Sequence, residues 1–364
     1  MALSIGIVGL PNVGKSTLFN ALNGGGAEAA NYPFCTIDPN VGIVSVPDKR
    51  LQPLIDIVNP QAVQSAVVEF VDIAGLVAGA ASGEGLGNKF LANIRECAAI
   101  AHVVRCFEDD NITHVSGKVH PLSDIETIDT ELMLKDMETV QKSVVRVEKL
   151  ARTGDKEAKA QVEIFKRVLA KLEDGITVRR QGVSDDDQER IKELCLLTGK
   201  PVLYVANVDD GSLPDGNEFV DQVREHAAEE GARVAVVSAQ IESELAEMDE
   251  ESKIEFLADL GLAEPGLNTV IREAYTLLDL ITYFTAGVKE VRAWTIHRGD
   301  TAPQAAGVIH TDFEHGFIRA ETIAYDDYVA LGGEGKSKEA GKMRLEGKDY
   351  IVKDGDVMHF RFNV

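Results

Sequence analysis

Nine consecutive residues near the N-terminus have the types and spacing of a phosphate-binding loop. The run Gly9-Leu10-Pro11-Asn12-Val13-Gly14-Lys15-Ser16-Thr17 follows an apolar, strand-like stretch at residues 3–8. Its glycines let successive backbone N–H groups point at phosphate oxygens, and Lys15 supplies a positive charge that is expected to act in catalysis. The Ser16 hydroxyl can ligate Mg²⁺, and the helix expected at 16–22 favours an anion at its N-terminus. We therefore expect a nucleotide-phosphate site contacted by Asn12, Val13, Gly14, Lys15, Ser16 and Thr17.

A D-x-x-G motif lies downstream, where a metal-linked switch would be expected. Asp72 and Gly75 follow the strand-like run at residues 67–71. In a switch of this kind Asp72 would hold Mg²⁺ through water, and the Gly75 N–H would contact the γ-phosphate. Thr36, in the loop between the two motifs, could close over the metal, so Ser16 and Thr36 are the expected metal ligands. The alternative for Thr36 is an ordinary turn threonine.

The position after Gly75 departs from small GTPases, which place there a glutamine that orients the attacking water. This chain has Leu76, whose side chain cannot polarise water. His114, in the loop after the strand-like run at 101–107, is our candidate for the missing catalytic group, because an imidazole can titrate near neutrality. An ordinary surface-loop histidine is the alternative. Asn12 is a candidate ligand for a monovalent cation such as K⁺ beside the phosphates.

Recognition of the base is expected at the end of the strand-like run at residues 201–208. GTPases carry Asn-Lys-x-Asp there, whereas this chain has Asn207-Val208-Asp209-Asp210. Val208 in place of lysine weakens a guanine assignment, yet Asp210 keeps an acid at the guanine-reading position. Ser238, after the next strand, is expected in the loop that closes over the base. The motif alone leaves both ATP and GTP open.

Length and composition set wider limits. A chain of 364 residues exceeds the size of a single hydrophobic core, and 45% hydrophobic with 27% charged residues is typical of soluble globular proteins. No apolar stretch reaches membrane-spanning length, and the four cysteines form no C-x-x-C pair. We therefore expect a cytoplasmic protein of two or three domains with reduced thiols.

The charge is unevenly distributed. The formal net charge is −23, yet residues 142–171 contain nine Lys or Arg and only four Asp or Glu. An acidic protein repels nucleic acid as a whole, so a basic segment is either a solvated helical face or a surface that docks a polyanion.

The order of elements predicts an α/β protein with two additions. Strands alternate with helices from residue 1 to about 130 and return at 200–280, which is typical of a doubly wound, mostly parallel P-loop sheet. Apolar residues spaced by four and three predict an antiparallel coiled-coil hairpin within 131–199, with its tip near Gly154. Short strands at 281–364 predict a separate β-rich domain.

The individual elements can be placed more closely. The hairpin seam is expected at Met133, Met137, Val140, Val144, Val147 and Ala151 in its first helix and at Val162, Phe165, Leu169 and Leu172 in its second. Strands are expected at 3–9, 42–47, 66–72, 101–107, 201–208, 233–238, 290–296, 317–324, 350–352 and 357–362, and a helix at 267–280.

With these residues in place, the chain resembles the YchF family, the Obg-like ATPase subgroup of the Obg family of translation-factor P-loop NTPases. The resemblance covers essentially all 364 residues. It rests on residues 31–36, 72–75 continuing through 80–91, 283–287 and 354–364. It implies a C-terminal TGS domain of β-grasp (ubiquitin-like) fold, hydrolysis of ATP in preference to GTP, and association with ribosomes and ribosomal RNA.

The resemblance also bears on single residues. The family's hydrophobic replacement of the catalytic glutamine matches Leu76, and its loop histidine matches His114. Family members usually have glutamate where this chain has Asp210.

Three functions therefore stand side by side. The first is a ribosome-associated, Mg²⁺-dependent ATPase that acts as a nucleotide switch in translation or stress response. The second is an Obg-type GTPase, favoured by Asp210 and opposed by Val208. The third is an RNA-binding module whose affinity for RNA is controlled by bound nucleotide, with negligible hydrolysis. The sequence does not fix the oligomeric state, and we expect a monomer.

Overall fold

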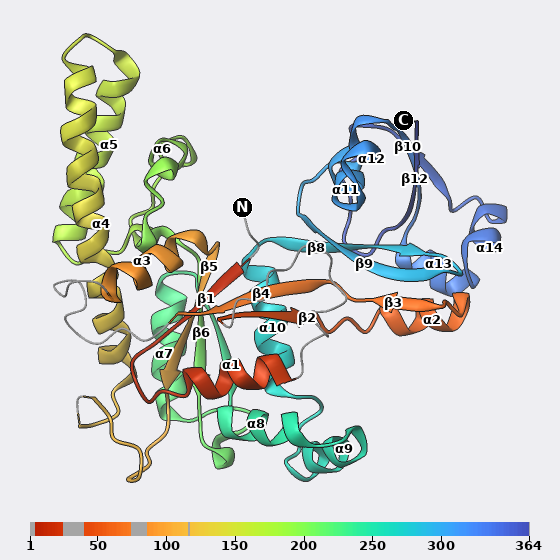
Figure 1. Ribbon diagram of the computed structural model, residues 1–364, viewed down its shortest axis with the longest axis horizontal. Coiled ribbons are helices and arrows are strands. Elements are labelled where there is room, and N and C mark those ends of the chain that lie inside the picture. The colour runs from red at the N-terminus through yellow and green to blue at the C-terminus, as the bar shows by residue number, and fades with distance from the viewer. Residues whose placement is uncertain (1–3, 25–39, 74–85, 116, 364) are drawn as a thin grey trace. The chain divides into compact units, whose positions relative to one another are not determined.

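The computed structural model describes residues 4–24, 40–73, 86–115 and 117–363 (Figure 1). Contacts divide the chain into two compact units. The first comprises residues 1–43 and 69–273, and the second comprises residues 44–68 and 274–364. The chain therefore leaves the first unit after residue 43. It contributes residues 44–68 to the second unit and then returns to the first.

The first sheet has six strands in the order β2-β4-β1-β5-β6-β7. They are β1 (Ser4–Val8), β2 (Val41–Ser45), β4 (Val67–Asp72), β5 (Ala99–Arg105), β6 (Val202–Asn207) and β7 (Arg233–Val237). β1 pairs in parallel with β4 and β5, β5 with β6, and β6 with β7. Every residue of β1, β5 and β6 is buried, as strands of a parallel sheet covered on both faces must be. The predicted doubly wound α/β fold is confirmed.

Helices connect these strands. They are α1 (Lys15–Gly24), α3 (Leu86–Glu96), α7 (Glu218–Glu229), α8 (Ala239–Glu247), α9 (Glu250–Asp259) and α10 (Gly266–Leu277). The helix predicted at 267–280 ends at Leu277, because Asp279 has a left-handed backbone (φ 53°) and strand β8 starts at Leu280. An L-residue in that conformation cannot continue a right-handed helix.

The helical insertion is an antiparallel pair, α4 (Pro121–Ala151) and α5 (Lys156–Glu173) (Figure 1). α4 begins ten residues before the predicted 131, because His120 caps it by accepting from Ser123 N and Pro121 occupies its first turn. Asp155 caps α5 through Ala158 N at 2.9 Å. The tip lies at Gly154 as predicted, where φ is 97°.

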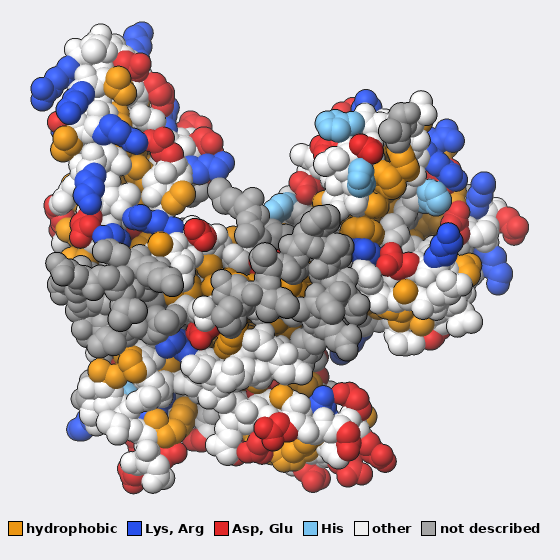
Figure 2. All heavy atoms as spheres, in the orientation of Figure 1, with side chains coloured by type: hydrophobic (Ala, Val, Ile, Leu, Met, Phe, Trp, Pro, Cys, Tyr) orange, Lys and Arg blue, Asp and Glu red, His pale blue; other side chains and the backbone are white. Residues whose placement is uncertain are grey.

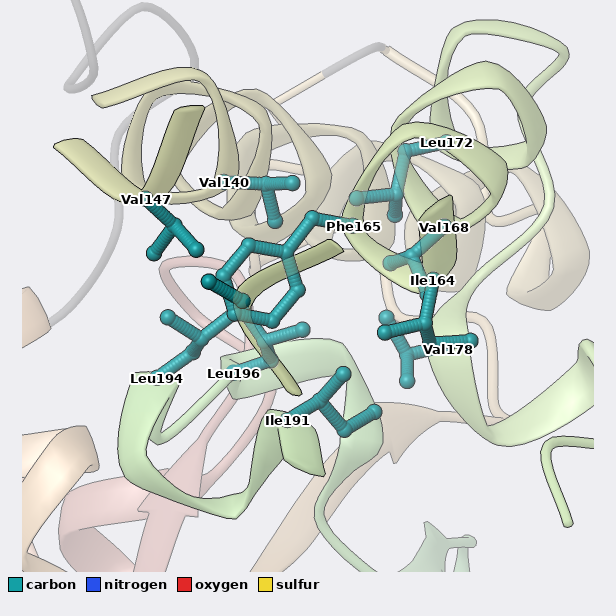
Figure 3. Packing of buried hydrophobic residues seen from close by; sticks show 11 residues of the cluster. Val140, Val147, Ile164, Phe165, Val168, Leu172, Val178, Ile191, Leu194 and Leu196 are labelled. Carbon is teal, nitrogen blue, oxygen red and sulfur yellow. The ribbon is translucent and has the colours of Figure 1, made fainter. Parts of the chain in front are cut away.

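The buried face of α5 is wider than the predicted seam (Figure 3). Phe165 and Leu172 are buried as expected, but Ile164 and Val168 are buried with them, whereas Val162 and Leu169 are only partly buried. The return segment packs against α5 from a second side and accounts for the difference. That segment comprises η3 (Val178–Arg180), α6 (Asp185–Ile191), η4 (Lys192–Leu194) and η5 (Leu197–Gly199).

The second unit contains a mixed sheet in the order β11-β10-β12-β8-β9-β3. Its strands are β3 (Ala62–Gln64), β8 (Leu280–Ala286), β9 (Glu290–His297), β10 (Phe317–Ile323), β11 (Arg344–Glu346) and β12 (Val357–Phe362). Its helices are α2 (Leu51–Val58), α11 (Ala302–Ile309), α12 (Thr311–His315), α13 (Tyr325–Leu331) and α14 (Glu334–Glu339). The prediction of a strand at 350–352 is wrong, because Ile351 forms only an isolated β-bridge with Thr301. β3, which the sequence did not indicate, pairs in parallel with β9.

Candidate functional site

The predicted phosphate-binding loop joins β1 to α1, and two of its glycines are sterically required. Gly9 and Gly14 have φ angles of 154° and 96°. A Cβ at Gly9 would lie 2.5 Å from the carbonyl oxygen of Val103, and a Cβ at Gly14 would lie 2.3 Å from Asn207 Nδ2. The loop therefore sits against the ends of β5 and β6, and larger residues at either position would displace it.

The start of α1 presents polar groups beside the end of β4. Ser16 and Thr17 are exposed and Lys15 is half-buried. Burial lowers the pKa of the Lys15 ammonium, and the nearby Asp72 carboxylate opposes that shift. Asp72 ends β4 in register with Ile7 of β1. A cation, a hydroxyl and a carboxylate thus meet where the helix N-terminus would receive phosphate.

These donors fit a Mg²⁺ that is bound mainly by phosphate and water. Such an ion needs only one or two protein oxygens, and the exposed Ser16 hydroxyl and the half-exposed Asp72 carboxylate supply that chemistry. Within the described ranges, no cluster of three His, Cys, Asp or Glu could enclose a metal by itself. Thr36, Gly75 and Leu76 lie outside the described residues, so their expected roles stay predictions.

Asn207 joins three segments of the site. Its Nδ2 donates to Val13 O at 2.9 Å, and its Oδ1 accepts from Ala239 N at 2.9 Å. The side chain is buried. Both polar ends of the amide are therefore used to hold the phosphate-binding loop against β6 and the start of α8.

The base-recognition residues differ in exposure. Val208 is buried, so its side chain offers no surface on which a base could lie. Asp210 is exposed at the start of η6 (Asp210–Ser212), and its Oδ1 accepts from the Ser238 hydroxyl at 3.0 Å. Ser238 also caps α8 by accepting from Ile241 N. The structure thus brings Asp210 and Ser238 into contact, while their expected roles in recognising the base stay predictions.

His114 lies in the loop between β5 and α4, and a neighbouring contact ties this loop to the phosphate-binding loop. Asn12 Nδ2 donates to Thr113 O at 3.1 Å, with Asn12 in a left-handed conformation (φ 62°). Asn12 Oδ1 is the atom that could meet a monovalent cation. His114 Nε2 is 3.0 Å from Asp124 Oδ2, and the imidazole is buried. The alternative of an exposed surface-loop histidine therefore does not describe this residue.

Two residues that hold the loop after β5 in place were not predicted from the sequence. Arg105 is buried at the end of β5 and donates to the carbonyl oxygens of Phe107, Asp109 and Ile112. The signal for Arg105 was present, because an arginine that ends an otherwise apolar central strand needs partners. Asp124 gave no such signal, since an acidic residue in a first helical turn is ordinary.

The sequence of this chain matches those of known proteins over its full length. A family described as "50S ribosome-binding GTPase" matches residues 4–149, and a family described as YchF-GTPase_C, "Protein of unknown function", matches residues 280–363. A Haemophilus influenzae protein described as "Ribosome-binding ATPase YchF" is 61% identical over 364 residues, covering 100% of both chains. The chain belongs to the YchF family. A Bacillus subtilis YchF with the same description is 60% identical over 366 residues, again covering 100% of both chains.

A solved YchF structure agrees with the fold. The Schizosaccharomyces pombe protein, described as a "YchF GTPase", is 39% identical and superimposes with a TM-score of 0.88, covering 98% of this chain and 97% of its own. The bacterial YchF proteins are described as ATPases and the yeast protein as a GTPase. The nucleotide base is therefore the point on which their descriptions differ.

None of the helices in the described ranges has both the length and the apolar character needed to cross a bilayer.

Proposed function

We propose that this protein is a Mg²⁺-dependent ATPase that associates with ribosomes in the cytoplasm and prefers ATP to GTP. The observation that carries the proposal is full-length identity of 61% to a protein described as a ribosome-binding ATPase. The phosphate-binding loop, with Lys15 and Ser16 at the start of α1, supplies the chemistry. Nucleotide state would act as a switch in translation or stress response.

The residues of the site have separate roles in hydrolysis. Lys15 and the N-terminus of α1 hold the β- and γ-phosphates, and Gly75 N–H meets the γ-phosphate. Ser16 and Thr36 would hold Mg²⁺, with Asp72 acting through water, and the bound ion would neutralise phosphate charge. His114 orients the attacking water in place of the glutamine that Leu76 replaces. Asn12 Oδ1 would be available as a ligand for K⁺.

The choice of base is argued from the end of β6. In GTPases the aliphatic part of the lysine side chain lies over the guanine ring. The buried Val208 offers no such surface to a base. Asp210 favours the alternative of an Obg-type GTPase, because its carboxylate lies beside the base-closing Ser238 and could accept from guanine N1 and N2. In our proposal the loss of this stacking surface affects the preference between ATP and GTP more than the Asp210 carboxylate does.

Calorimetric titration with ATP and with GTP, each with Mg²⁺ and in potassium or sodium buffer, tests the proposal. At least tenfold tighter binding of ATP, about 1.4 kcal/mol, is expected. Equal or tighter binding of GTP would make the protein a GTPase. Asp210→Ala then separates the binding of the two nucleotides, since loss of GTP binding with ATP binding spared would show that Asp210 still recognises guanine.

The hairpin is the proposed contact with ribosomal RNA. Figure 2 shows Lys and Arg side chains gathered over its far end. Among the described residues no ion pair forms at Lys149, Arg152, Lys156 or Lys159, whereas Arg146, Lys166 and Arg167 are paired with acids. Unpaired exposed cations release counterions when they meet phosphate, which makes binding depend on salt.

Reversing the tip charges tests this contact. Replacing Lys149, Arg152 and Lys156 together with Glu should weaken co-sedimentation with ribosomes and flatten its dependence on salt. Replacing the ion-paired Arg146, Lys166 and Arg167 by Gln gives a control on the same helices. Unchanged co-sedimentation of the tip variant would place the contact on the second unit or on ribosomal protein.

We also propose that the protein is a monomer, and sedimentation equilibrium of the purified protein tests this oligomeric state.

A further inference from the structure

The loop after β6, which carries the residues expected to recognise the base, is anchored at both ends to one residue of the neighbouring strand. We call residues 208–216 the base loop. Cys106, directly after β5, is 0% exposed. Its N–H donates to Asn207 O at 2.8 Å, where the base loop begins, and its carbonyl oxygen accepts from Asn217 Nδ2 at 2.8 Å, where the loop ends. Both ends of the base loop are therefore held beside the end of β5.

The side chain of Asn217 has two separate sets of partners. Its Oδ1 accepts from Phe219 N at 3.1 Å and from Val220 N at 3.2 Å, which caps α7. Its Nδ2 donates to Cys106 O and also to Ser212 Oγ at 3.1 Å. A serine or an aspartate caps a helix as well as an asparagine does. The two donated hydrogen bonds are therefore what the amide adds to the cap.

Ser212, one of these two partners, belongs to the turn that carries Asp210. The turn is η6, and Ser212 N also donates to Asp209 O at 3.2 Å within it. Asp210 Oδ1 accepts from the Ser238 hydroxyl at 3.0 Å, and both residues are expected to face the base. The hydrogen bond from Asn217 to Ser212 therefore restrains the turn that presents Asp210.

We propose that Asn217 is a positioning residue for the nucleotide base, which holds the base loop in its binding conformation. The inference rests on the proposed role of Asp210 and Ser238 in contacting the base. Asn217 acts through Ser212 and through the carbonyl group of Cys106, without touching the nucleotide.

The expected gain is affinity for the base. A base loop that already has its binding conformation loses little conformational entropy when a nucleotide binds. The phosphate-binding loop is held by a different residue, Asn207, which donates to Val13 O at 2.9 Å. Loss of the Asn217 donors should therefore weaken contacts to the base and leave contacts to the phosphates unchanged.

Asn217→Asp in the full chain is the first test, because a carboxylate can still cap α7 but cannot donate to Cys106 O. We expect KM and the calorimetric Kd for ATP to rise about fivefold, as for one lost hydrogen bond, while kcat changes less than about twofold. Inorganic tripolyphosphate with Mg²⁺ has no base, so its affinity should stay within about twofold of the wild-type value.

Asn217→Ser is the second variant, since a serine also caps the helix and brings no charge. Both variants should weaken ATP binding to a similar extent. A loss of affinity in Asn217→Asp alone would show that the new carboxylate repels the Cys106 carbonyl group. That result would overturn the inference, because the missing donor would then have no effect of its own.

Gln181→Glu is the matched control. Gln181 Nε2 also donates to two carbonyl oxygens, those of Val168 and Ile176, but these belong to α5 and to the turn that follows it. The variant makes the same chemical change in the same unit of the chain. We expect it to lower stability and to leave KM for ATP unchanged, and a rise equal to that of the Asn217 variants would refute a specific role for Asn217.

Each outcome separates the inference from the proposed function. Unchanged affinity for ATP in both Asn217 variants overturns the inference and leaves the ATPase proposal intact. Equal losses of affinity for ATP and tripolyphosphate, or a fall in kcat with unchanged KM, would also overturn it. Tighter binding of GTP than of ATP by the wild type removes the proposed preference for ATP, and the Asn217 variants should then lose affinity for GTP in the same way. Absence of hydrolysis by the wild type removes the ATPase proposal, while the calorimetric comparison still decides the inference.

Discussion

Glu242 on α8 makes the stability of the first unit depend on pH in an unusual direction. Its side chain is buried, with the residue 4% exposed, and its Oε1 accepts from Gly266 N at 2.7 Å at the start of α10. Burial raises the pKa of Glu242 from 4.5 to about 7, and hydrogen bonds from Gly266 and Leu267 partly oppose the shift. The folded protein therefore keeps this proton over a range in which the unfolded chain has lost it.

The direction and size of this pH effect on the free energy of unfolding follow from the linkage between proton binding and folding. Below pH 4.5 both states are protonated and the carboxyl adds no penalty. As pH rises from 4.5 to about 7 the unfolded chain ionises first, so stability falls. Above pH 7 the full penalty is present, and at about 1.4 kcal/mol per pKa unit it amounts to about 3 kcal/mol.

Glu242→Gln should remove this dependence, because an amide oxygen can still accept from Gly266 N without carrying charge. We expect the advantage of the variant over the wild type, in free energy of unfolding, to grow by about 2 kcal/mol between pH 5 and pH 8. Urea unfolding followed by far-UV circular dichroism reports on the helical first unit. The single tryptophan, Trp294, lies on β9 in the second unit, so its fluorescence serves as an internal reference.

Glu247→Gln is the control, since it removes a charge from the exposed face of the same helix. A Glu242→Gln variant that is less stable than the wild type by the same amount at every pH would refute the reasoning. That result would mean that the carboxylate is ionised in the fold and stabilises the start of α10.

Three other perturbations have defined outcomes. Asp136→Ala should lower the free energy of unfolding by about 3 kcal/mol or more in urea, because Asp136 is 0% exposed and accepts from Leu197 N, Thr198 N and Thr198 Oγ1. Gly14→Ala should abolish calorimetric binding of ATP without unfolding the chain, since its Cβ would lie 2.3 Å from Asn207 Nδ2. Removing Mg²⁺ with EDTA should weaken ATP binding at least tenfold, and an unchanged affinity would argue against phosphate coordination through Ser16.

The sequence predicted the parts of the site that depend on neighbouring residues. The phosphate-binding loop is one continuous motif, and the strands before it and at β5 are apolar runs, so their chemistry and their burial could be predicted together. The coiled-coil seam of α4 was predicted for the same reason, because its period is local. The extra burial of Ile164 and Val168 was not, since it comes from residues beyond the end of α5.

Contacts between distant segments could not be predicted. Asn207 belongs to the motif expected to recognise the base, and its amide also donates a hydrogen bond to Val13 O across 194 positions of the chain, which the motif does not indicate. The contact between His114 and Asp124 likewise depends on where the loop after β5 places His114. No local pattern encodes such pairings, because many residues of suitable type lie at comparable distances along the chain.

The excursion of residues 44–68 into the second unit has a consequence for biosynthesis. β3 pairs with β9 through Ala62 and Glu290, and α2 buries Leu51 and Leu54. The N-terminal share of the second unit therefore leaves the ribosome long before its partner strands exist, with a delay on the order of 10–50 s at ordinary elongation rates. A fragment that starts at residue 274 would lack β3 and expose the edge of β9. The sheet of this unit can be completed only after β12 has been synthesised, so until then the nascent chain carries an unfinished sheet.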